Sequence, residues 1–140
     1  QALERLSNYQ SISLIFPAYT YHPKEILQGF YKFCSEYAFH YDVIDNIDNF
    51  SVTEGTVYIS LMENDLVVLL EKIMETKMEI GKQVGVISYN ETPLKKIILN
   101  GITTISTDFH AMGTFAAEMI LNKSTGHMAV PFYLTLRDSI

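Results

Sequence analysis

Short apolar runs, each ended by polar or turn-forming residues, recur along this chain of 140 residues. The clearest is Val84–Ser88, which continues directly into the polar segment 89–92. Runs that are apolar at consecutive positions are typical of strands buried on both faces of a parallel sheet, because helices cover both faces of such a sheet. The chain must therefore alternate strands with covering helices. In open parallel sheets, polar strand ends such as 89–92 lie in the crevice where ligands bind.

The segments between these runs have helical periodicity. In Lys24–Ala38 the apolar residues recur at intervals of three and four, and Pro23 suits the start of a helix. Thr92 is a natural N-cap for a further short helix that begins at Pro93. We predict strands over Ile12–Phe16, Tyr41–Ile44, Val57–Leu61, Val84–Ser88, Ile102–Ser106 and Phe132–Leu136, and helices over Ala2–Leu6, Lys24–Ala38, Asn64–Lys77, Pro93–Ile98 and 108–121. This alternation predicts a single domain over 1–140 with an α/β fold: an open, mostly parallel, doubly wound sheet with helices on both faces.

Charge and composition limit the partners of this chain. Its net charge is −6, and its 10 Lys and Arg residues are scattered among 16 Asp and Glu residues. Since phosphate binding needs a basic face, we expect the chain itself not to contact DNA. The apolar runs are too short to span a membrane, and the first residues do not read as a signal peptide. The single cysteine, Cys34, is expected to be a buried inert thiol, which is consistent with a reducing, cytoplasmic location.

The sequence lacks the motifs of several nucleotide-binding and catalytic folds. It contains no Gly-x-Gly-x-x-Gly, no Gly-x-x-x-x-Gly-Lys-Ser/Thr and no Gly-x-Ser-x-Gly. The 4 histidines lie far apart and without the spacing of metal ligands. We therefore expect no catalytic residues, no cofactor and no metal ion, and we do not expect an enzyme.

Several segments carry a resemblance to a known family. They are Gly29-Phe30 in the first long helix, the run Gly81–Val86, the strand end Ser88–Pro93 followed by Ile102–Ile105, and the terminal Arg137–Ser139. In this order they resemble the effector-binding domain of lactose-repressor/galactose-repressor family regulators. The resemblance covers nearly the whole chain but only part of such a regulator. It implies the C-terminal lobe of a two-lobed, periplasmic-binding-protein-like domain, in which segment 108–122 resembles the helix that packs on the absent N-terminal lobe.

The resemblance implies a function as well as a fold. The chain would be the ligand-sensing and dimerisation part of a bacterial transcriptional regulator, with a sugar-like effector. DNA would be bound only by a head outside this chain, either a helix-turn-helix or a GntR-type winged helix. One alternative is a solute-binding protein of a transporter, which shares this fold. A flavodoxin-like receiver or small enzyme is disfavoured, because the first strand ends in Phe16-Pro17 rather than in an acidic pair.

Six residues are candidates for effector binding because they follow the predicted strands. They are Tyr19, Tyr21, His22, Glu63, Asn90 and Thr107. The alternatives are half-buried loop aromatics for the two tyrosines, an Asx-turn for Asn90 and a helix cap for Thr107. The chain also departs from the family pattern, because Glu25–Leu27 stands where an arginine is usual, Met62-Glu63 replaces Asn-Asp, and Asn90 replaces Asp. Either the ligand is different or the site is vestigial.

The predicted helix that includes Leu66–Met78 carries more apolar residues than one sheet-facing stripe requires. The matching helix of the family forms part of a dimer interface, and a wide apolar face usually needs a partner. We therefore expect a homodimer; the alternative is a fully buried helix. The candidate interface residues are Leu66, Val67, Val68, Leu70 and Met74.

Overall fold

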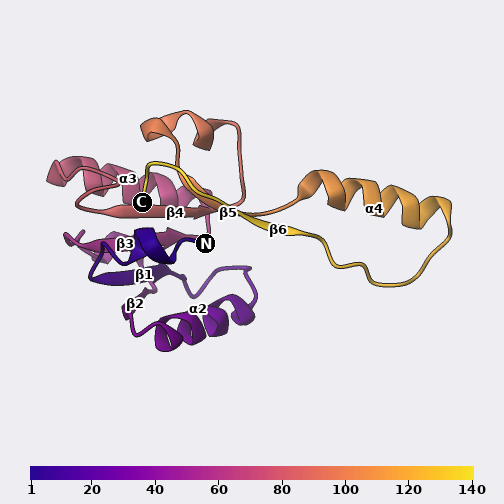
Figure 1. The fold of residues 1–140 in the computed structure, drawn as a ribbon, viewed down its shortest axis with the longest axis horizontal. Helices are drawn as coiled ribbons and strands as arrows, with labels where there is room; N and C mark the ends of the chain where they lie inside the picture. Colours follow the sequence, from indigo (N-terminus) through magenta and orange to yellow (C-terminus); the bar gives the residue numbers. More distant parts are fainter.

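The chain forms one six-stranded sheet flanked by helices, as a computed structural model of residues 1–140 shows (Figure 1). The strand order is β2-β1-β3-β4-β5-β6. Strands β1 to β5 pair in parallel, and β6 pairs with β5 antiparallel. The strands are β1 (Ser11–Ile15), β2 (His40–Ile44), β3 (Thr56–Ser60), β4 (Gly85–Tyr89), β5 (Thr103–Thr107) and β6 (Phe132–Thr135). The predicted open, mostly parallel α/β sheet is therefore confirmed.

Helices α1, α2 and α3 divide between the two faces of this sheet (Figure 1). On one face, α1 and α2 bury Leu6, Phe30 and Cys34 against Ile12 and Leu14 of β1. On the other face, α3 buries its own apolar stripe against the strands. Each fully buried aliphatic side chain stabilises the fold by about 1.5–3 kcal/mol. The helical segments are α1 (Leu3–Leu6), α2 (Lys24–Glu36), α3 (Glu63–Thr76) and α4 (Phe109–Leu121), with single 3₁₀ turns η1 (Ile47–Asn49), η2 (Leu94–Lys96) and η3 (Ile98–Asn100).

Cys34 is buried as predicted. Its side chain is fully enclosed in the core that α1 and α2 form on the sheet. Burial raises the pKa of the Cys34 thiol to about 11. Because the thiolate is the reactive form, the group is inert at neutral pH.

The predicted helix Pro93–Ile98 is wrong. The segment enters the two separate turns η2 and η3, and within η3 Leu99 and Asn100 have φ values of 53° and 61°. A helix this short gains too few hydrogen bonds to offset its nucleation, so tertiary contacts decide the backbone. Thr92 does not cap it, since its hydroxyl oxygen is buried without a hydrogen-bond partner.

The C-terminal segment after β6 closes the sheet at the amino end of β5. Ser139 Oγ accepts a hydrogen bond from the Thr103 backbone N–H at 2.7 Å and donates one to the Val86 carbonyl at 2.6 Å. Gly81 allows this segment to approach, because a Cβ at Gly81 would lie 1.9 Å from the Asp138 carbonyl oxygen. The terminal Arg137–Ser139 is thus part of the folded core.

Helix α4 projects away from the sheet, and the chain returns from it as β6 (Figure 1). Asp108 caps it by accepting a hydrogen bond from the Ala111 N–H at 2.8 Å. None of its residues is buried, and Ile120 and Leu121 are 77% and 81% exposed. Its apolar face therefore covers nothing within this chain. No helix of the protein is long and apolar enough to cross a membrane.

Helix α3 presents only part of its apolar surface to solvent. Leu66 is 2% exposed and belongs to the core, so it cannot contribute to an interface. Its burial follows from its position on the same stripe as Leu69 and Ile73, which face the sheet. Val67 and Met74 are 51% and 70% exposed. The other two candidates, Val68 and Leu70, are half-buried.

Candidate ligand-binding site

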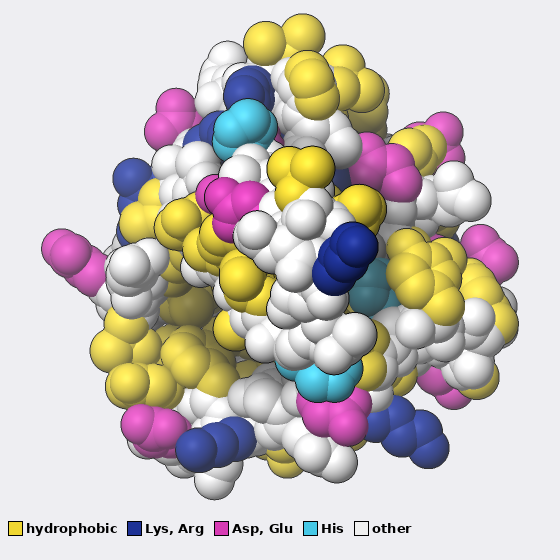
Figure 2. All heavy atoms as spheres, turned by 90° about the vertical axis from the view of Figure 1, so that its right-hand side faces the viewer, with side chains coloured by type: hydrophobic (Ala, Val, Ile, Leu, Met, Phe, Trp, Pro, Cys, Tyr) yellow, Lys and Arg dark blue, Asp and Glu magenta, His cyan; other side chains and the backbone are white.

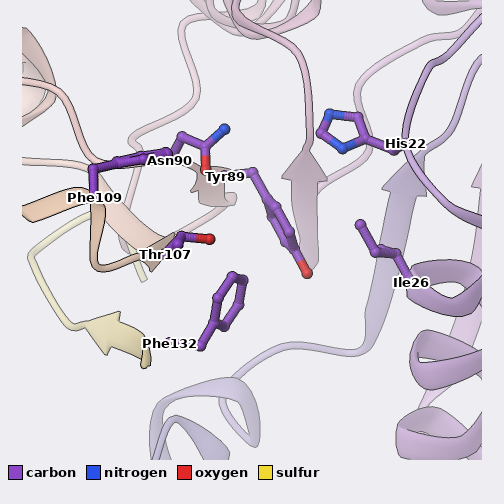
Figure 3. A pocket seen from close by; sticks show the side chains of 7 residues that line it. All are labelled: His22, Ile26, Tyr89, Asn90, Thr107, Phe109 and Phe132. Atoms are coloured by element: carbon purple, nitrogen blue, oxygen red, sulfur yellow. The ribbon is translucent and has the colours of Figure 1, made fainter. Parts of the chain in front are cut away.

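A pocket of about 340 Å³ lies at the carboxyl edge of the sheet (Figure 3). This is the edge at which open α/β sheets bind ligands. The residues that line it come from the β1–α2 loop, α2, the ends of β4 and β5, and the starts of α4 and β6. They are His22, Ile26, Tyr89, Asn90, Thr107, Phe109 and Phe132. Three of the predicted site residues, His22, Asn90 and Thr107, therefore lie together at one pocket.

Asn90 sits at the sharp turn where β4 ends. Its φ is 61°, in the left-handed region that asparagine tolerates better than most residues. Its N–H donates to the Ile105 carbonyl at 2.8 Å, which ties this turn to β5. The backbone is thus held by the sheet while the carboxamide group is left at the pocket (Figure 3).

Tyr89 forms the central aromatic wall of the pocket (Figure 3). Its ring centroid lies 5.9 Å from that of Phe132 and 6.2 Å from that of His22, in an edge-on arrangement with the histidine. Burial raises the pKa of the Tyr89 phenol above its ordinary value. The hydroxyl group is therefore protonated and neutral at physiological pH.

His22 brings an unpartnered polar atom to the pocket. Its backbone N–H donates to Thr20 Oγ1 at 3.2 Å, which fixes the loop. Its Nε2 atom is buried and has no hydrogen-bond partner within the chain. Leaving a buried polar atom unpaired costs about 1–3 kcal/mol, so a ligand that pairs with Nε2 would recover this free energy.

Lys95 is a buried positive charge directly behind this site. Its side chain is 1% exposed, and Nζ lies 2.7 Å from Glu63 Oε2. Nζ also donates to the carbonyls of Tyr89 and Asn90, both at 2.9 Å. All three ammonium protons therefore have acceptors, and the end of β4 is fastened to the start of α3. Glu63, a predicted effector contact, is the ion-pair partner of Lys95 and does not line the pocket.

A second ion pair lies beside the same strand end. Arg137 donates to both carboxylate oxygens of Glu91, each at 3.0 Å, and the Thr104 hydroxyl also donates to Glu91. Burial opposes ionisation of Glu91, but these hydrogen bonds prevail and lower its pKa below the ordinary value. The Lys95 ammonium group and the Glu91 carboxylate, both near Asn90, are thus each paired with an opposite charge within the chain.

The two predicted tyrosines do not reach the pocket. Tyr21 is 78% exposed, and its ring lies 4.5 Å from the His22 ring. Tyr19 is 71% exposed, and its hydroxyl makes a long 3.5 Å hydrogen bond to Asp65 Oδ1. Asp65 is itself 3% exposed, with Oδ2 unpartnered, and burial raises its pKa.

Sequence reasoning missed four lining residues: Ile26, Tyr89, Phe109 and Phe132. Tyr89 could have been found, because it stands directly before Asn90 in the polar segment 89–92 that follows the predicted strand Val84–Ser88. Phe109 could also have been found, because it follows Thr107 by two residues, whereas Phe132 could not, because its place depends on the path of the chain through α4 and back along β5. No group of three or more His, Cys, Asp and Glu side chains is arranged to hold a metal ion.

An apolar groove of about 680 Å³ adjoins the pocket and shares Ile26, Tyr89 and Phe132 with it. The groove runs between α1, α2 and the sheet, and most of the residues that line it are hydrophobic. Figure 2, which faces the end of the molecule where α4 projects, shows a hollow lined by hydrophobic side chains. The pocket is therefore apolar on the side that faces the groove.

Solved structures of LacI-family repressors have the same fold as this chain. A probable maltose operon transcriptional repressor from Staphylococcus aureus matches with a TM-score of 0.76 and 20% identity, over 99% of this chain and 55% of that one. A LacI family transcriptional regulator from Mycobacterium smegmatis matches with a TM-score of 0.72 and 14% identity, over 99% of this chain and 61% of that one. The Lac repressor bound to ONPG matches with a TM-score of 0.70 and 18% identity, over 97% of this chain and 49% of that one. No family model and no curated protein sequence matches this chain.

These likenesses define the class of fold. The chain has an α/β fold like that of these LacI-family repressors, as the resemblance in the sequence predicted. It spans about half the length of the repressors it matches.

Proposed function

We propose that this chain is the ligand-sensing lobe of a DNA-binding transcriptional regulator, acting in the cytoplasm by binding rather than by catalysis. The observation that carries the proposal is the pocket at the carboxyl edge, with the Asn90 carboxamide and the unpaired His22 Nε2 brought together on a LacI-type fold. The effector is a small metabolite, sugar-like if it follows the resemblance in the sequence.

The pocket has one wall in this chain, and a second lobe supplies the other. Ligand sites usually bury most of the ligand surface, which an open edge of one lobe cannot do. Helix α4, with its exposed apolar face, packs on that second lobe. A ligand that binds the closed arrangement of the lobes better than the open one shifts the equilibrium toward closure. The shift moves the DNA-binding heads, which lie outside this acidic chain.

A test uses the regulator that contains this chain, with Asn90→Gly as the variant. Glycine removes the carboxamide yet tolerates the positive φ, whereas alanine would add backbone strain. We expect unchanged DNA affinity and a ligand response weakened by about 1–3 kcal/mol, the cost of an unpaired polar partner. The measurement is a titration of DNA release, beside a melting curve of the same variant.

Two controls separate the alternatives. The 140-residue chain alone should not shift DNA at physiological salt in the presence of competitor, because its net charge is −6. If the protein that contains this chain also binds no specific DNA site, the regulator proposal is refuted. A secretion signal in that protein would then favour a solute-binding protein of a transporter.

A further inference from the structure

The pocket walls are predominantly aromatic. Tyr89, Phe109 and Phe132 line it, and the His22 imidazole adds a fourth ring. Phe109 and Phe132 are 48% and 53% exposed, so large ring surface is free next to the cavity. Aromatic faces bind flat π-systems well, with base–aromatic stacking typically worth about 1–3 kcal/mol per ring.

No Asp, Glu, Lys or Arg side chain lines the pocket. The charged groups at this edge of the sheet are occupied: Glu63 pairs with Lys95, and Glu91 pairs with Arg137. A charged ligand would lose hydration here without gaining a countercharge from this lobe. The neutral pocket therefore favours an uncharged ligand.

The pocket has few polar groups, and their arrangement suits the edge of a flat ring. Asn90 offers a donor and an acceptor side by side in one plane, a pattern that pairs with an adjacent ring N–H and carbonyl. His22 Nε2 and the hydroxyl groups of Tyr89 and Thr107 complete the polar set that this chain brings to the pocket (Figure 3). A sugar ring carries hydroxyl groups around its whole periphery, and most of them would meet aromatic or aliphatic carbon here, at a cost for each unpaired group.

We infer that this pocket binds a flat, uncharged nitrogen heterocycle rather than a polyhydroxylated sugar. The inference rests on the proposed function of the pocket as the effector site. Tyr89, Phe109 and Phe132 stack on or border the ring, and Asn90 reads its edge. A volume of about 340 Å³ accommodates a small ring system of this kind.

The test is a titration of the isotopically labelled regulator that contains this chain, followed through the backbone amide resonances of this lobe. The probes are uracil, orotate as the same ring bearing a carboxylate, and methyl β-D-galactopyranoside. We expect uracil to shift the resonances of Tyr89, Asn90 and Thr107, and the other two probes to leave them unmoved at equal concentration.

Phe132→Leu supplies the discriminating variant, and Tyr133→Leu its matched control. The two aromatic residues are neighbours in β6 and are both 53% exposed, but only Phe132 lines the pocket. Losing one stacking face should weaken uracil binding about fivefold or more in Phe132→Leu. Tyr133→Leu should bind as the parent chain does, and amide spectra of both variants report that the fold is intact.

The other outcomes overturn the inference in distinguishable ways. Shifts at the pocket with the galactoside but not with uracil refute the heterocycle and leave the proposed ligand-sensing function standing. If orotate shifts the pocket resonances in the same way as uracil, the argument that the pocket favours an uncharged ligand is refuted. If no probe moves the pocket resonances up to the solubility limit, the heterocycle inference fails, whereas the proposed function is judged separately by the ligand response of Asn90→Gly.

Discussion

At the scale of single residues, Lys95 determines the shape of the site without lining it. Its ammonium group holds the carbonyls of Tyr89 and Asn90, two of the residues that line the pocket. Sequence reasoning placed Lys95 on a short helix, where a lysine would face solvent. Lys95 is instead buried at the end of β4 as the ion-pair partner of Glu63, which explains why Glu63 does not line the pocket.

Lys95→Met should destabilise the protein by about 1–3 kcal/mol, because two buried carbonyls lose their donor. Glu63 is half-exposed and would be rehydrated, which keeps the loss below that of a fully buried pair. Lys96→Met is the matched control, since Lys96 is the exposed neighbour, and its effect should stay within about 0.5 kcal/mol. Urea denaturation measures both. Equal stabilities of the two variants would mean that the buried ammonium group is not needed.

Asp65 should make stability depend on pH in the direction opposite to a paired carboxylate. Burial raises its pKa above the ordinary 3.8, with Asp48 adding to the rise and the Tyr19 hydrogen bond opposing it. The folded state thus prefers the protonated form of Asp65. The free energy of unfolding is therefore highest below the pKa that Asp65 has in the unfolded chain, and it falls as pH rises through the higher pKa of the folded state.

Asp65→Asn removes this dependence while keeping an oxygen that can accept from Tyr19. We expect the variant to match the parent below about pH 3.5 and to be increasingly more stable than it toward pH 7. The measurement is the urea midpoint of both chains across that range. Glu91, whose pKa is lowered, changes both chains alike and cancels from the difference. A variant that is less stable at neutral pH would show that Asp65 is ionised and favourably paired.

At the scale of elements, the buried strands were the most predictable part. The predicted strands over Ile12–Phe16, Val57–Leu61 and Val84–Ser88 lie within about one residue of the observed β1, β3 and β4, because consecutive apolar residues admit few other structures. The antiparallel pairing of β6 could not be predicted, since it depends on a long excursion through α4. For the same reason, the place of Phe132 in the aromatic wall of the pocket could not be deduced.

Helix α4 should be the least protected helix in amide hydrogen exchange. It buries none of its residues and contains Gly113, which costs about 1 kcal/mol in a helix interior. An unsupported helix of this length is marginal in water. Amides of α3, which buries Leu66, Leu69 and Ile73, should exchange much more slowly. Similar protection of the two helices would mean that a second copy covers α4 in solution.

At the scale of the whole molecule, the two exposed apolar surfaces lie on different helices, α3 and α4, and call for different partners. In the proposed regulator, α4 meets the second lobe, whereas Val67 and Met74 on α3 meet another copy of the chain. The sequence indicated the α3 surface through its excess of apolar residues and the α4 surface through the family resemblance of segment 108–122. It could not separate Leu66, which packs inward, from Val67 beside it, because that distinction is set by the rotation of α3 on the sheet.

The homodimer proposal is tested by sedimentation of the 140-residue chain with two single substitutions. If α3 forms the interface, Val67→Asp places a carboxylate in it and should convert the dimer to monomer, because a buried unpaired charge is strongly unfavourable. Ile120→Asp, on the 77% exposed position of α4, should leave the dimer unchanged. Both sites are exposed in the single chain, so neither substitution disturbs its core. Dissociation by Ile120→Asp alone would assign self-association to α4, and a parent chain that sediments as a monomer at micromolar concentration would refute the α3 interface.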